Sequence, residues 1–443
     1  MNPACRKNLA ICSGKMTGAS SSPIATRIGS LRWQMAFLVC AAIAISYLDR
    51  QTLPVAIGEI RREIPITNTV KAFLDSAFLL TYGLMYVGGG RLMDVLGTRR
   101  GFFWIMIFWS LACASHGLAS GVVMLAASRL LLGAGEGGGF PAATRVVAEW
   151  FPVKERSTAM GIINAGTAVG AVAAPPLIVL VLTHGGWLGI APWRWVFIIT
   201  GGLGLLWTAY WWIEYRQPGD RRGPNGAAPS AEPAIALLDI LAFRETWAVV
   251  LAKFLSDGAW YFYLFWLPKF LLEAFHLDIR TAGAVGWIPY AASGVGCLFG
   301  GGLSSWLLRR GQSVDRARKI ALGASAALMP WVMLVPTMHS VGWVIFVFSM
   351  AFFGQQSWST LVMVLPTDMI PVRAVGTLAG LVGFGGAMGG VALGQLVGYM
   401  RDHGSSFTPA LVIAGSLHIL AFATICIGIP RIQTLRFPAS QAP

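Results

Sequence analysis

The chain has 443 residues, of which 56% are hydrophobic and only 12% are charged. Soluble domains are roughly half apolar and about a quarter charged, so this composition excludes an ordinary soluble enzyme or binding domain. The formal net charge of +14 would favour nucleic acid in a soluble protein, but here its distribution over loops indicates membrane topology, and we expect no nucleic-acid partner.

Twelve apolar runs are long enough to cross the roughly 30 Å hydrocarbon core of a bilayer as helices. They cover residues 33–53, 72–93, 102–118, 122–147, 159–183, 195–213, 247–272, 284–308, 320–336, 342–365, 375–400 and 409–429. The sequence therefore predicts an all-α integral membrane protein with twelve transmembrane helices in two six-helix bundles. Residues 1–32 hold no apolar core, so we expect a tail there rather than a cleaved signal peptide.

Lys and Arg residues concentrate in the two tails and in the loops that follow even-numbered spans. The opposite side of the predicted membrane carries only Arg61, Arg62, Lys71, Arg194, Lys269, Arg280 and Arg401. By the positive-inside rule, the N-terminus and the C-terminus are both expected in the cytoplasm. We expect a multi-pass protein of the cell inner membrane.

The fourth span carries two opposite charges, Arg129 and Glu136, seven residues apart. This spacing places both side chains on one helix face, which is expected to look into a cavity or the protein interior rather than at lipid. A poorly solvated cavity disfavours a charged carboxyl, so we expect Glu136 to load and release a proton and Arg129 to tune it. The flanking glycines are expected to let water or a ligand approach. A permanent ion pair between the two residues is the alternative.

A Gly- and Pro-rich linker divides the predicted spans into six and six. We expect five regions: a cytoplasmic tail (1–32), an N-terminal bundle (33–215), a cytoplasmic linker (216–245), a C-terminal bundle (246–430) and a second cytoplasmic tail (431–443).

The two halves also align with one another. Residues 151–154 overlay 370–373 without a gap, which indicates a duplicated unit with a site between the halves. The same register places Gln355 opposite Glu136. We therefore predict an ionic wall from the N-terminal half and a neutral, hydrogen-bonding wall from the C-terminal half.

The loop between the second and third spans, residues 90–100, reads GRLMDVLGTRR. It resembles the major facilitator superfamily signature G-x-x-x-D-R-x-G-R-R. In this interpretation Asp94, Arg99 and Arg100 tie neighbouring helix ends together in one state and release them in another, a gating role. In the second half Ser305 stands where related transporters carry an acid, so a symmetric second latch is not expected. Electrostatic anchoring at the inner leaflet is the alternative.

Four segments are similar to the anion:cation symporter family: YLDR at 47–50, the charged glycine-rich run at 129–141, WFPVKER at 150–156 and NAGT at 164–167. The aromatic run at 260–269 and QSWS at 356–359 more narrowly resemble bacterial hexuronate transporters. The resemblance implies proton-coupled uptake of a small organic anion, first of all a hexuronate such as glucuronate or galacturonate, by alternating access. A monomer is expected to suffice.

The resemblance also implies site residues. Asp49 would take part in proton coupling, and Arg50 would grip the substrate carboxylate with its planar fork, with Arg129 as the rival clamp. Because adjacent helical side chains point about 100° apart, one of Asp49 and Arg50 is expected to reach the cavity and the other a neighbouring helix. The other expected substrate contacts are polar or aromatic: Tyr47, Tyr82, Asn164, Thr167, Tyr261, Gln355, Gln356, Ser357 and Trp358.

Other functions remain open at this point. The histidines and cysteines lack metal-ligand spacing, so we expect no metal, no cofactor and no enzyme activity. Galactonate, glucarate or an aromatic carboxylate could replace hexuronate as substrate, and a drug:proton antiporter or a transporter-like sensor is a more distant alternative. Lys253 and Asp257, four residues apart, are expected to pair, with a gating role possible.

Overall fold

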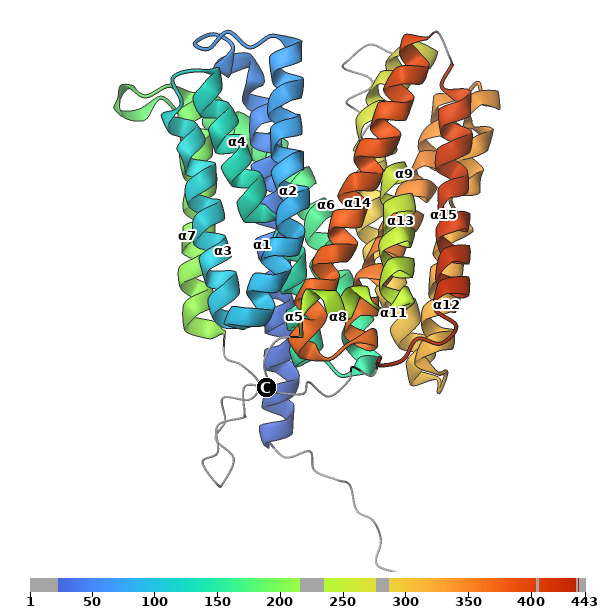
Figure 1. Ribbon diagram of the computed structural model, residues 1–443. Helices are drawn as coiled ribbons and strands as arrows, with labels where there is room; N and C mark the ends of the chain where they lie inside the picture. Colours follow the sequence, from blue (N-terminus) through green and yellow to red (C-terminus); the bar gives the residue numbers. More distant parts are fainter. Residues whose placement is uncertain (1–22, 216–234, 276–286, 404–405, 436, 438–443) are drawn as a thin grey trace, which may run out of the picture.

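The computed structural model describes residues 23–215, 235–275, 287–403, 406–435 and 437. Two groups of helices stand side by side and splay apart at one end (Figure 1). The N-terminal half contains α1 (Pro23–Ile60), α2 (Asn68–Leu96), α3 (Thr98–Ser115), α4 (Val122–Glu136), α5 (Gly139–Trp150), α6 (Val153–His184) and α7 (Pro192–Glu214). The C-terminal half contains α8 (Leu237–Leu241), α9 (Arg244–Phe275), α11 (Ile288–Arg309), α12 (Val314–Ala326), the 3-10 helix η3 (Pro330–Thr337), α13 (Val341–Met369), α14 (Val372–Asp402) and α15 (Thr408–Gly428).

Each predicted span coincides with helical structure over its described residues, and four details differ, the first being that the ninth span is divided between α12 and η3. The fourth span is divided into α4 and α5, with Glu136 as the last residue of α4. The short helix α8 lies in the predicted linker, and α1 begins at Pro23, inside the predicted tail. Residues 1–22, 216–234 and 438–443 of the predicted tails and linker lie outside the described residues.

Eight helices of the described part are long and apolar enough to cross a membrane. The four other predicted spans correspond to α2, α4 with α5, α9 and α13. Of these, α4 with 15 residues and α5 with 12 residues are each too short to cross a membrane alone. The count of twelve membrane-crossing helices stays a prediction.

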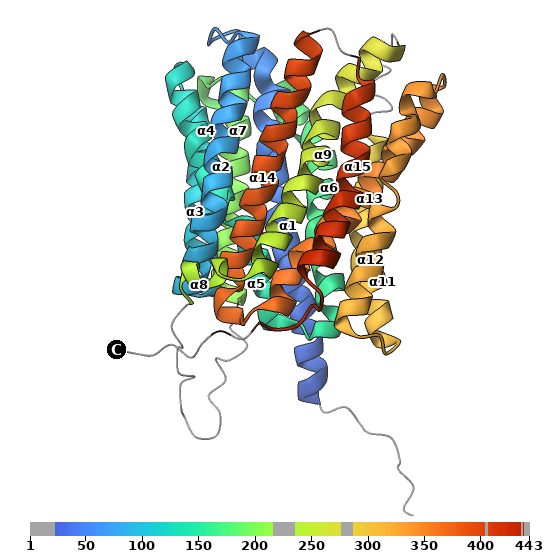
Figure 2. The same cartoon turned by 45° about the vertical axis from the view of Figure 1, so that its right-hand side comes forward.

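The two halves meet through long helices that pack pairwise. α14 lies between α2 and α9 (Figure 2), and α6 packs on α11. Glycines permit these close approaches: a Cβ at Gly90 would collide with the carbonyl of Gly376, and one at Gly301 with the carbonyl of Ser157. We call the end of the bundles that carries α5 and α8, lowest in Figure 1, the closed end, and the opposite end the open end.

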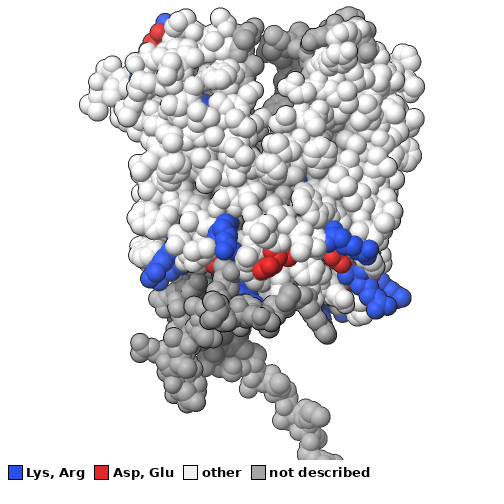
Figure 3. Space-filling view, in the orientation of Figure 1, with Lys and Arg blue, Asp and Glu red and all other residues white. Residues whose placement is uncertain are grey.

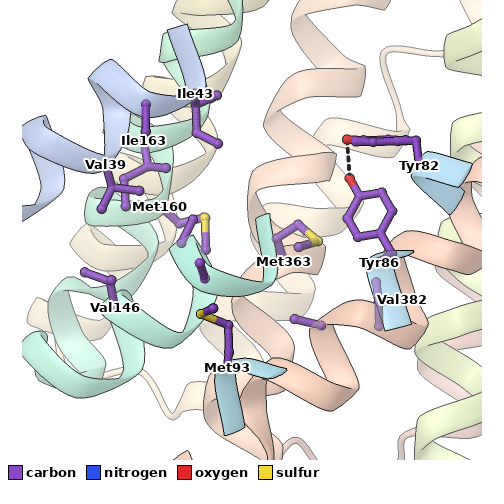
Figure 4. Close-up of a cluster of buried hydrophobic side chains, with 14 of the residues drawn as sticks. Val39, Ile43, Tyr82, Tyr86, Met93, Val146, Met160, Ile163, Met363 and Val382 are labelled. Carbon is purple, nitrogen blue, oxygen red and sulfur yellow. Dashed lines mark hydrogen bonds between the residues drawn. The ribbon is translucent and has the colours of Figure 1, made fainter. Parts of the chain in front are cut away.

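A buried apolar cluster joins helices of both halves (Figure 4). Met93 of α2 and Met160 of α6 lie near Met363 of α13 and Val382 of α14. Tyr82 and Tyr86, one turn apart on α2, hydrogen bond to each other at 2.8 Å. Because Tyr86 and Met363 also line the cavity, this cluster forms its apolar floor toward the closed end.

Candidate functional site

A cavity of ≈ 360 Å³ lies between the two halves and is lined by α1, α2, α4 and α6 from one side and α9, α11 and α13 from the other. We call it the outer cavity, since it includes Lys71 and Asp75 near the start of α2 at the open end. A smaller space of ≈ 40 Å³, the inner cavity, continues from it and shares Tyr47, Arg50 and Tyr261. Figure 3 shows the surface hollowed between the halves at the open end.

Arg50 of α1, which lines both cavities, forms an ion pair with Glu136 of α4, which is buried behind the cavity wall. Arg50 Nε lies 2.6 Å from Glu136 Oε2, and the hydroxyl of Ser46 donates to the same oxygen at 2.7 Å. The Glu136 side chain has 0% of its surface exposed and that of Arg50 has 19%. The Arg50 guanidinium carbon lies 4.8 Å from the ring centroid of Tyr47 and 4.3 Å from that of Tyr82. The arginine is thus held by a carboxylate and two aromatic faces.

Arg129 faces the cavity, as its helix face predicted, but does not pair with Glu136. It lines the outer cavity, is 2% exposed, and its guanidinium carbon lies 5.8 Å from the ring centroid of Phe78. In the part of the chain that the structure describes, its Nε and Nη2 have no hydrogen-bond partner. The alternative of a direct Arg129–Glu136 pair is therefore wrong: the partner of Glu136 is Arg50, because α1 passes closer to that oxygen.

The glycine run around Glu136 serves close packing rather than access. A Cβ at Gly133 would collide with the Phe78 carbonyl of α2, and one at Gly135 would lie 2.7 Å from the Trp109 Cα of α3. A Cβ at Gly137 would lie 2.7 Å from the Tyr82 carbonyl oxygen. The expectation that these glycines admit water or a ligand is wrong, since they bring α4 against its two neighbours.

Asp49 and Arg50 point to different surroundings. Arg50 lines both cavities, whereas Asp49 is 1% exposed and its Oδ2 accepts a hydrogen bond from Trp109 Nε1 of α3 at 2.7 Å. One member of this adjacent pair therefore reaches the cavity and the other a neighbouring helix, as the 100° step of an α-helix requires.

Most of the predicted contact residues line the cavity. Thr167 faces the outer part, Asn164, Tyr82 and Gln355 the inner part, and Tyr47, Tyr261 and Gln356 both. The amide Nδ2 of Asn164 donates across the halves to Thr360 Oγ1 at 3.0 Å and to Gln356 Oε1 at 3.3 Å.

Ser357 and Trp358 lie elsewhere. The hydroxyl of Ser357 is 2.6 Å from that of Ser325 on α12, and Trp358 is fully buried with its ring 5.7 Å from that of His418 on α15. Neither residue lines the outer or the inner cavity. The structure therefore does not bring them together with the other predicted contacts, because they lie on the sides of α13 that pack within its own half.

The C-terminal wall of the inner cavity is charged. Lys253 Nζ lies 3.0 Å from Asp257 Oδ1, and both residues line the inner cavity. Sequence reasoning paired these residues from their i,i+4 spacing but predicted a neutral wall for this half, and that prediction is wrong. The sequence signal for a charged wall was the presence of Lys253 and Asp257 within an apolar span.

The interhelical contact predicted around Asp94, which we call the first latch, lies at the closed end. Its arginine differs from those that the motif predicted. Asp94 Oδ1 lies 2.6 Å from Arg145 Nη1 of α5, and its Oδ2 accepts from the Thr377 backbone N–H and hydroxyl, each at 2.6 Å. Asp94 thus joins α2 and α5 to the N-terminal end of α14. Arg99 instead donates to the Trp212 carbonyl of its own half at 2.8 Å, and Arg100 is exposed. The arginine of this first latch is Arg145, in place of the Arg99 and Arg100 expected from the motif.

A second latch lies beside it, contrary to the sequence expectation. Ser305 accepts from the Thr158 backbone N–H at 3.2 Å, near the start of α6. Arg318 of α12 is fully buried and donates to Asp368 Oδ2 at 2.8 Å and to the Ser157 hydroxyl at 3.0 Å. Arg156 Nη1 lies 3.2 Å from Asp368 Oδ1. The hydroxyl of Ser305 thus stands where related transporters carry an acidic side chain. Arg318 and Asp368 form the ion pair of this second latch.

No group of three or more His, Cys, Asp and Glu side chains that could hold a metal ion occurs among the described residues. The polar groups that line the cavity are Arg50, Arg129, the Lys71–Asp75 and Lys253–Asp257 pairs and amide side chains, with aromatic rings beside them. This set can bind an anion with hydroxyl groups and can exchange a proton at a carboxylate.

Comparisons with known proteins agree with this architecture. The family model for the Major Facilitator Superfamily matches residues 39–394. The chain is 29% identical to a D-galactonate transporter of Escherichia coli O6:H1, over 89% of this chain and 95% of that protein. It is 28% identical to a hexuronate transporter of Escherichia coli K12, over 90% and 94%. Among solved structures, a Major Facilitator Superfamily transporter, FucP, in the outward conformation is similar with a TM-score of 0.69 and 16% identity, over 89% of this chain and 98% of that one.

Proposed function

This chain belongs to the Major Facilitator Superfamily, and we propose that it carries a sugar acid into the cell together with protons. It is a membrane-spanning transporter and not an enzyme. The central observation is the ion pair between Arg50, which lines the cavity between the halves, and the buried Glu136. At a guanidinium with a buried carboxylate partner, a substrate carboxylate competes with that partner for the arginine, and protonation of the partner favours the substrate.

The proposed coupling follows from that competition. While Glu136 is ionised, it occupies the Nε of Arg50. A proton on Glu136 removes the charge that holds the arginine, which then turns its planar fork to the substrate carboxylate. Loss of that proton after the cavity has opened to the other side restores the pair and expels the substrate. Proton and substrate therefore move in the same direction.

Two further charged groups support this cycle. We assign Asp49 as a second proton site, since its carboxylate is buried behind Arg50 against Trp109. Arg129 keeps its proposed role in coupling through its positive charge, because it lies in the same cavity and keeps that cavity favourable to an anion. Tyr47, Tyr82, Asn164, Thr167, Tyr261, Gln355 and Gln356 are the proposed contacts for substrate hydroxyls and ring faces.

Alternating access would operate through the two latches. Both lie at the closed end, and we propose that this end faces the cytoplasm, with both chain termini on that side. Lys and Arg side chains gather toward this end on the face shown in Figure 3, as the positive-inside rule requires of a cytoplasmic surface. Separation of Asp94 from α14 and of Arg318 from α6 would open the cavity inward. We propose that a single copy in the inner membrane performs this cycle.

The substrate class is a sugar acid. Hexuronate is the first candidate on the sequence resemblance, and galactonate stands beside it because relatives named for each are about equally similar. The test is uptake by the purified protein in liposomes. An inward proton gradient should drive accumulation of labelled glucuronate, galacturonate, galactonate or glucarate above the external concentration. Equal internal and external concentrations for every acid in the panel would overturn the proposal.

A further inference from the structure

A second ion pair lines the inner cavity and has no part in the cycle above. Lys253 Nζ lies 3.0 Å from Asp257 Oδ1, one turn further along α9, and donates to the Ser359 hydroxyl of α13 at 2.7 Å. Lys253 is 5% exposed and Asp257 is 9% exposed. A buried pair of this kind carries a desolvation cost, so its position on the wall of a substrate cavity needs an explanation.

Asp257 has a second partner of its own. Gln355 Nε2 of α13 donates to Asp257 Oδ1 at 3.2 Å, and Gln355 Oε1 in turn accepts from His418 Nε2 of α15. A Cβ at Gly386 of α14 would collide with the Asp257 carboxylate, so the glycine leaves room for it. The carboxylate is therefore held from the C-terminal half, and Lys253 is not its sole hydrogen-bond donor.

One N–H group of Lys253 has no hydrogen-bond partner among the residues that the structure describes. An ammonium group carries three N–H bonds, and two of them are used, by Asp257 and Ser359, among the residues that the structure describes. The inner cavity that Lys253 lines is small, ≈ 40 Å³, and Arg50 lines it from the opposite half. One cation from each half thus borders the same confined space.

We propose that Lys253 binds a second acidic group of the substrate, so that this transporter favours sugar diacids over monoacids. This inference rests on the proposed function and names the substrate class within it. A diacid would place one carboxylate on Arg50 and the other on the free N–H of Lys253, bridging the two halves. A monoacid would leave Lys253 bound to Asp257 and Ser359 alone.

Isothermal titration of the purified full-length protein with D-glucarate, a diacid, and D-galactonate, a monoacid, tests this. A charge-assisted hydrogen bond corresponds to about a tenfold change in affinity, so glucarate should bind wild type about tenfold more tightly than galactonate. Lys253→Gln should abolish that difference and change galactonate affinity by less than about threefold. Lys319→Gln is the matched control: it removes the lysine of another i,i+4 pair, with Asp315 at 2.8 Å, away from the cavity, and should keep the preference.

Asp257→Asn separates a binding role from a structural one. It frees Lys253, so it should keep or increase the preference for glucarate, whereas a merely structural pair would respond alike to loss of either member. The double variant Lys253→Gln/Asp257→Asn leaves no unpaired charge and should lose the preference even if Lys253→Gln alone fails to fold. Galactonate binding without any preference for glucarate in wild type would overturn this inference alone. Binding of none of glucarate, galactonate, glucuronate and galacturonate would overturn the proposed function with it.

Discussion

Arg50 of α1, which lines the cavity between the two halves, forms an ion pair at 2.6 Å with Glu136 at the end of α4. The glutamate side chain is fully buried, and the arginine alone of the two is partly exposed to the cavity. Arg50 can therefore bind a ligand in the cavity, while the charge of the buried Glu136 carboxylate determines whether Arg50 is free to do so. The proposed coupling depends on this arrangement, in which Arg50 faces the cavity and Glu136 is buried next to it.

Arg50→Lys should weaken substrate binding while keeping the positive charge. Lysine lacks the planar fork and cannot hold a carboxylate through two N–H groups, so about 1.5–3 kcal/mol of binding free energy should be lost. This corresponds to at least a tenfold higher Kd for the transported acid, measured by isothermal titration. An unchanged Kd would move the carboxylate clamp to Arg129.

Asp49→Asn should separate coupling from binding. The Asp49 carboxylate contacts Trp109 and does not line the cavity, so the Kd for substrate should change by less than about threefold. Accumulation driven by a proton gradient should nevertheless decrease, because one proposed proton site is lost. A variant that accumulates substrate as wild type does would exclude Asp49 from coupling.

Gln356→Ala and Ser357→Ala form a matched pair of neighbours. Gln356 lines both cavities, and its loss should raise the substrate Kd about fivefold, the value of one neutral hydrogen bond. Ser357 contacts Ser325 of α12 instead, and its loss should leave the Kd unchanged. A larger effect from Ser357→Ala than from Gln356→Ala would contradict the orientation of α13.

Asp94→Asn should weaken the closed end. Removing one partner from a buried ion pair costs about 3–5 kcal/mol, and Asp94 holds both Arg145 and the start of α14. In a cysteine-free background, spin labels at Val123 and His403 report the separation of the halves at the open end. The population with a short distance between them should increase.

Asp315→Asn is the control for that variant. Asp315 pairs with Lys319 on the surface of α12, with side chains 28% and 18% exposed, and such pairs contribute about 0–1 kcal/mol. Its distance distribution should match that of wild type. If Asp94→Asn also matches wild type, the first latch does not set the conformation.

Sequence patterns predicted the helices well, because every span is apolar over a length that a bilayer requires. They could not predict the partner of Glu136. Arg129 lies on the same helix and Arg50 lies 86 residues away, and only the tertiary placement of α1 in the bundle decides between them. The arginine of the first latch was missed for the same reason, since Arg145 reaches Asp94 from α5.

The misassigned residues of α13 have another cause. This helix is buried on nearly all sides from Ala351 to Met369, so no polar stripe fixes which face meets the cavity. Gln356 and Ser357 are adjacent and polar, and their sequence context does not distinguish them. The charged wall of the C-terminal half was visible as Lys253 and Asp257, but a pair on one helix gives no sign of what it faces.

The most direct measurement of the central claim uses Glu136→Gln in liposomes, with a labelled acid that wild type transports. Glutamine cannot exchange a proton, so this variant should lose accumulation driven by an inward proton gradient. It should retain counterflow exchange of internal for external substrate, because Arg50 remains available to bind the carboxylate. Full accumulation by Glu136→Gln under the gradient would contradict the assignment of Glu136 as the proton carrier.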